Sequence, residues 1–135
     1  MRRLSLFSIL FSAALLSLVM PLQAMSLESK LKEYKEFHDV LHPLEHEALP
    51  KKDYESIRAK ADDLFRLGNA IIKLGVPRGT KPSQVQAFEQ ELSNFNNALK
   101  QFAKVAKGGK DEDVRLSFEA VHDSYEMLAG MLPQE

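Results

Sequence analysis

Apolar side chains recur every three or four residues along most of the chain. The clearest stripe runs through Val85, Phe88, Leu92, Phe95, Leu99, Phe102 and Ala106, and the next one through Val114, Phe118, Val121, Tyr125, Leu128 and Leu132. This spacing gives an α-helix one apolar face. No segment alternates apolar and polar residues, so the pattern predicts helices and no sheet.

Two further helices are predicted nearer the N-terminus. The first covers residues 26–49, and its inward seam is predicted to be Leu27, Leu31, Tyr34, His38, Leu41, Glu45 and Ala48. Pro43 lacks a backbone donor and disfavours helical geometry at the residue before it, which predicts a kink or a break near His42. The second helix runs over residues 54–74, with Asp53 as a plausible cap.

The connections between these helices are mostly short. Two glycines and two prolines mark residues 75–82 as a loop, and Gly108 and Gly109 end the third helix just before Asp111, which could cap the fourth. Four helices of about 20 residues joined in this way predict an all-α fold, an antiparallel up-down-up-down four-helix bundle.

The first 24 residues have the three parts of a secretory signal peptide. Arg2 and Arg3 are followed by an apolar segment from Leu4 to Met20, then by Pro21 and the small residue Ala24. We expect cleavage after Ala24, which leaves residues 25–135 as one exported, periplasmic domain without a membrane segment. A retained anchor is the alternative, because the apolar segment is somewhat long.

The composition of the chain excludes several covalent attachments and argues against one class of partner. The chain has no cysteine, which excludes disulfides, a lipoprotein anchor on cysteine and haem attached through Cys-x-x-Cys-His. Loss of Arg2 and Arg3 with the signal peptide takes the formal net charge from −1 to −3. That balance argues against nucleic acid as a partner.

Three of the four histidines lie four residues apart, at His38, His42 and His46. On an ideal helix their rings fall within an arc of about 80°. Two histidines at this spacing can bind one metal ion, since both rings lean toward the same side. This arc assumes a straight helix, and a bend at Pro43 would change the direction of His46 relative to His38.

The fourth histidine is predicted to meet the first helix. Pairing Leu27 with Leu132 in antiparallel helices places His38 opposite position 121, next to His122. We therefore expect one transition metal ion (Zn, Cu or Ni), bound chiefly by His38, His42 and His122, with His46 joining if the helix bends at Pro43. The structural alternative is four imidazoles hydrogen-bonded in the core or exposed on its rim.

The second helix offers oxygen ligands at the same level. Pairing His46 with Asp53 across the first turn places position 61 opposite His38, so Asp62 or Asp63 could join the site. The alternative is that these carboxylates and Arg66 form a solvated face.

Residues 42–46 (HPLEH), Lys52-Asp53 and residues 121–128 (VHDSYEML) together resemble a largely uncharacterised group of small exported bacterial helical proteins, similar to haem-free relatives of cytochrome c′. The resemblance implies a periplasmic four-helix bundle with its site at the histidines of the first and last helices. The Cys-x-x-Cys-His of cytochrome c′ is missing, so haem chemistry is not implied.

Two classes of function fit these patterns. One is a metal-binding bundle for buffering, delivery or sensing. The other is a protein-interaction or chaperone-like module without metal, whose partner is another periplasmic protein and whose histidines are incidental or sense pH. We expect no enzyme: a di-iron carboxylate centre needs paired Glu-x-x-His motifs, and the single copy from Glu119 to His122 has Glu119 outward of the predicted seam.

Overall fold

The computed structural model describes the backbone of residues 22–133 and the side chains of residues 32–133. All regular structure within this range is helical, which confirms the all-α prediction, and no strand occurs there. The elements are α1 (Leu22–Pro43), the π-helix η1 (Leu44–Ala48), α2 (Tyr54–Ala59), α3 (Ala61–Leu74), α4 (Pro82–Ala106) and α5 (Asp111–Gly130). None of the described helices is long and apolar enough to span a membrane.

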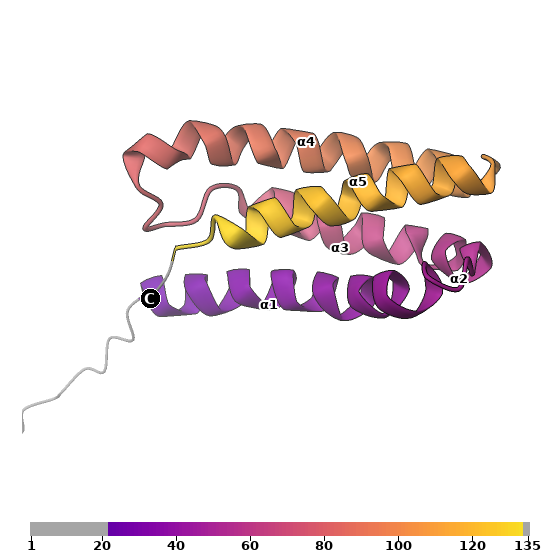
Figure 1. Ribbon diagram of the computed structural model, residues 1–135. Coiled ribbons are helices and arrows are strands. Elements are labelled where there is room, and N and C mark those ends of the chain that lie inside the picture. The colour runs from indigo at the N-terminus through magenta and orange to yellow at the C-terminus, as the bar shows by residue number, and fades with distance from the viewer. Residues whose placement is uncertain (1–21, 134–135) are drawn as a thin grey trace, which may run out of the picture.

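The four long helices lie side by side (Figure 1). Helix α3 packs against α1 and α4, α4 packs against α5, and the short α2 packs against η1 and α5. Helices α1 and α5 meet through Tyr125, whose hydroxyl donates a hydrogen bond of 2.9 Å to the carbonyl of Tyr34. The ring of Phe37 stacks on that of Tyr125, with centroids 5.0 Å apart.

The two predicted C-terminal stripes form much of the core. Buried side chains on α4 are Phe88, Phe95, Leu99 and Phe102, and those on α5 include Val114, Phe118, Val121, Tyr125 and Leu128. The face of each helix that enters the core is therefore the one that the spacing predicts.

The predicted seam of the first helix is wrong at two positions. The side chains that α1 and η1 bury are Tyr34, Phe37, Leu41, Leu44 and Ala48. Phe37 and Leu44 occupy the places expected for His38 and Glu45, which are half-buried beside the seam. The physical reason is that burying a polar side chain costs free energy whereas burying Phe or Leu gains it.

The single helix predicted over residues 54–74 is two helices. Lys60 separates α2 from α3, with φ −99° and ψ 1°. The two parts pack on different neighbours, because α2 contacts η1 and α5 while α3 contacts α1 and α4. A change of direction at Lys60 allows both sets of contacts.

The helix does not break at His42. Helix α1 continues to Pro43 and passes directly into η1, in which Leu49 N–H donates to the carbonyl of Leu44 over 2.8 Å. The Asp53 cap is confirmed, since its carboxylate accepts from Ser56 N–H at 3.1 Å. The Asp111 cap is wrong: Lys110 is the cap residue of α5, and Asp111 instead binds Arg58.

The predicted signal peptide lies outside the described residues apart from its last three positions, which form the start of α1.

Candidate functional site

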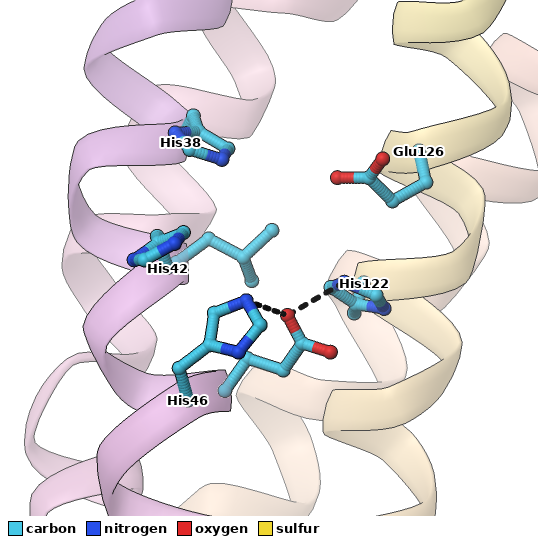
Figure 2. Close-up of a pocket in the computed structure, with 7 residues that line it drawn as sticks. His38, His42, His46, His122 and Glu126 are labelled. Atoms are coloured by element: carbon cyan, nitrogen blue, oxygen red, sulfur yellow. Dashed lines mark ion pairs between the residues drawn. The ribbon is translucent and has the colours of Figure 1, made fainter.

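A hollow of about 250 Å³ lies between α1, η1 and α5. It is lined by His38, Leu41, His42, Glu45, His46, His122 and Glu126 (Figure 2). All four histidines of the chain therefore border one space, as their spacing predicted for the first three and helix pairing predicted for the fourth.

The three histidines of the first helix form a row along its axis. The ring centroids of His38 and His42 are 5.1 Å apart, and those of His42 and His46 are 4.3 Å apart. His42 is exposed and the His46 side chain is 57% exposed. Rings this accessible can rotate about their side-chain bonds without disturbing the core.

The carboxylate of Glu45 connects η1 to α5 at the His46 end of this row. Glu45 Oε2 lies 2.9 Å from Nε2 of His122 and 3.2 Å from Nε2 of His46. The same carboxylate oxygen therefore lies within ion-pairing distance of an imidazole nitrogen on each side. The other ring nitrogen of His122, Nδ1, lies 3.2 Å from Oδ1 of Asp123. These partners orient His122 and place it against η1.

The level of His122 differs from the predicted one. The aromatic ring beside His38 is that of Tyr125, with centroids 6.1 Å apart, whereas His122 shares Glu45 with His46. His122 therefore lies further along the first helix than the pairing of Leu27 with Leu132 placed it. Apolar spacing does not fix how far two antiparallel helices slide along one another, and the shift of about one turn is already present at His38, before Pro43.

Two carboxylates of the hollow were not among the predicted ligands. Glu45 belongs to the predicted seam of the first helix, and Glu126 lies one helical turn after His122, which is a spacing that places both on one face. Figure 2 shows the Glu126 carboxylate directed toward the first helix near His38. The sequence signal that could have indicated Glu45 and Glu126 is that each is a polar residue next to the apolar seam of its helix.

The carboxylates of the second helix do not belong to the hollow. Asp62 is exposed, and Asp63 lies 3.4 Å from the Lys60 ammonium and 3.9 Å from the Arg66 guanidinium. Neither lines the space between α1 and α5. Asp62 and Asp63 are therefore not placed to join this site, and the solvated-face interpretation fits their surroundings.

A second hollow, of about 240 Å³, lies on the other side of the Glu45–His122 pair. Its lining residues are Glu45, Leu49, Phe118, Glu119, His122 and Asp123. Both carboxylate oxygens of Glu119 accept from Nη1 of Arg115 at 2.8 Å. Glu119 is thus paired with a cation on its own helix, and it does not line the hollow of the histidine row.

The wall behind the histidine row is apolar and neutral. Burial, together with the nearby carboxylates of Glu126 and Asp39, raises the pKa of Tyr125 to about 12. Its hydroxyl therefore stays protonated at neutral pH and keeps its hydrogen bond to Tyr34. This contact holds α5 against α1 behind the hollow.

The donors of the hollow are imidazole nitrogens and carboxylate oxygens. Such ligands suit divalent first-row ions, whereas thiolates and thioethers are the ligands that Cu(I) prefers. In the described part of the chain, no three of these donors yet converge on a single point at metal-binding geometry. Coordination would therefore require ring rotations and the release of Glu45 from one of its two histidines.

The sequence matches no protein family model, no curated protein and no solved structure.

Proposed function

We propose that this protein is an exported, periplasmic helical bundle that binds a divalent transition metal ion reversibly. The observation that carries the proposal is the gathering of all four histidines, with Glu45 and Glu126, around one hollow between two helices that are far apart in sequence. The spacing of four residues gathers three of them on one helix face, and His122 joins them from the opposite helix. The resemblance to haem-free, cytochrome c′-like exported proteins implies a periplasmic bundle with its site at these histidines, and it names no metal.

The ligand set favours Zn²⁺, Cu²⁺ or Ni²⁺. Imidazole binds each of these ions well, and a carboxylate offsets part of the added charge. Access from solvent, seen in the exposed rings of His42 and His46, favours exchange of the ion over permanent burial. Buffering or delivery of the metal, or sensing of its concentration, are the activities that such an exchangeable site serves. Haem and catalysis are not part of the proposal.

The proposed scaffold is an up-down-up-down four-helix bundle in which α2 and α3 together take the place of the second helix. The order of colours along the long helices in Figure 1 supports this arrangement. In such a bundle α1 and α5 are neighbours, which is the condition for a site shared between His122 and the histidine row.

Calorimetric titration of residues 25–135 with Zn²⁺, Cu²⁺, Ni²⁺ and Fe²⁺ tests the proposal. We expect one of the first three ions to bind with saturable stoichiometry. His42→Ala and His122→Ala should each weaken that binding by at least roughly 10-fold to 100-fold, since even groups that only orient ligands have effects of this size. Asp62→Asn is the matched control, because Asp62 is exposed and outside the hollow, and it should leave the affinity unchanged.

Two results would contradict the proposal. The first is no saturable binding of any tested ion to the folded protein. The second is equal affinity in the wild type and His122→Ala, which would leave only a surface chelate on the first helix. A further expectation is that affinity falls in acid, because only neutral imidazole coordinates a metal.

A further inference from the structure

The π-helix η1 follows a proline inside a helix. Pro43 keeps helical dihedral angles, φ −66° and ψ −28°, but has no N–H to donate to the preceding turn. The next turn is wider than an α-turn, because Leu49 N–H donates to Leu44 O at 2.8 Å, five residues back. Single π-turns of this kind recur at functional sites.

The wider turn changes which way His46 points. In a continuous α-helix each four-residue step advances about 40°, so His46 would lie about 80° around the axis from His38. A π-turn holds more residues per turn, so the same step advances less and His46 turns back toward the row. The observed ring distances agree, because His42 and His46 are closer, at 4.3 Å, than His38 and His42, at 5.1 Å.

Glu45 lies within the same turn and reaches the opposite helix. Its carboxylate reaches Nε2 of His122 at 2.9 Å while also contacting His46. On the inner side of the turn, Leu44 and Ala48 are buried at 7% and 8% exposure. The π-turn is thus anchored in the core while its outer side presents Glu45 and His46 to the hollow.

Pro43 itself contributes nothing to the core. It is exposed, and it does not line the hollow. A proline in a helix interior costs stability, because it removes a hydrogen bond and its ring crowds the carbonyl four residues earlier. A feature that costs stability and shapes a candidate site is better explained by the site than by the fold.

We infer that Pro43 is a positioning residue for metal binding: by enforcing the π-turn it adds His46 and Glu45 to a site that a straight helix would limit chiefly to His38, His42 and His122. The inference rests on the proposed function. It also assigns the turn a role in affinity, since a site that includes His46 and Glu45 binds more tightly than one formed by His38, His42 and His122 alone.

The test is a double-mutant cycle between Pro43→Ala and His46→Ala, with metal affinity measured by calorimetry using the ion that binds the wild type best. Pro43→Ala should weaken binding roughly 10-fold to 100-fold, as expected for loss of ligand orientation. His46→Ala should weaken binding in the wild type but change it little in the Pro43→Ala background. Pro82→Ala is the control, because Pro82 opens α4 outside the hollow and should not alter affinity.

The outcomes separate the two proposals. If the wild type binds no ion, the proposed function fails and this inference fails with it. If the wild type binds metal and Pro43→Ala binds equally well, with His46→Ala still weakening binding in both backgrounds, the metal site stands and Pro43 has no positioning role.

Folding of the variant is checked by circular dichroism and urea unfolding. We expect the free energy of unfolding of Pro43→Ala to be no lower than that of the wild type, because the substitution restores a backbone donor. Pro43→Gly restores the same donor without a side chain and serves as the second variant. If both fail to fold, Pro43 serves the fold and the inference is overturned.

Discussion

Replacing Phe37 with alanine tests the packing on which the site is built. Phe37 has no exposed surface, and it contacts two other rings: Tyr125, stacked at 5.0 Å, and Phe95, edge-on at 5.3 Å. Truncation of a buried phenylalanine costs about 3 to 5 kcal/mol, and loss of two aromatic pairs favours the upper end of that range. The expected loss is thus about 4 to 5 kcal/mol, a large share of the stability of a domain of this size.

Urea unfolding followed by circular dichroism, with a chelator present, measures this loss. The midpoint of thermal unfolding should fall by roughly 15 to 25 °C. His38→Ala is the matched control, because it removes the adjacent, half-buried ring and should cost about 1 kcal/mol. If His38→Ala costs more than Phe37→Ala, the observed seam of the first helix is wrong and the histidine row faces the core.

Two further predictions concern pH and export. Because the folded-state pKa of Tyr125 is raised to about 12, chiefly by burial, its contribution to stability is complete below about pH 10, the ordinary tyrosine value, and is lost as pH rises toward 12. Between about pH 10 and pH 12, the free energy of unfolding in urea should fall less in Tyr125→Phe than in the wild type. An equal fall in the two proteins would contradict the raised pKa of Tyr125. Mass spectrometry of the exported protein should find an N-terminus near Met25, whereas an intact Met1 in the membrane fraction would disprove cleavage.

The stripes of α4 and α5 were predictable because their core positions are apolar at nearly every turn. The first helix was harder. Phe37 and His38 are neighbours, and Leu44 and Glu45 are neighbours, so two phases fit its spacing of three and four. Spacing alone does not decide between them; the observed phase is the one that buries Phe37 and Leu44 in place of His38 and Glu45.

The histidine site was predictable in outline and not in detail. Spacing brought His38, His42 and His46 to one helix face, and antiparallel pairing brought His122 to that helix. The level of His122 and the place of Glu126 depend on how the helices pack, and the contacts of Glu45 lie in the π-turn after Pro43. A proline in a helix predicts a disturbance, but whether the chain kinks, breaks or widens follows from tertiary packing.

The break at Lys60 has a similar origin. The apolar spacing continues from Ile57 to Ala61 and Leu64 without interruption, so no local signal marks the end of α2. The change of packing partners between α2 and α3 imposes it. Part of that packing is the Arg58 guanidinium, which donates to the carbonyls of Val105 and Gly109.

Anomalous X-ray diffraction from crystals of the metal-loaded protein is the most direct test of the central claim. The account predicts one strong peak in the hollow between α1, η1 and α5, with imidazole nitrogens of both the histidine row and His122 about 2.0 to 2.1 Å from the ion if it is zinc. A peak bound only by side chains of the first helix, or a peak elsewhere on the protein with the hollow empty, would contradict it.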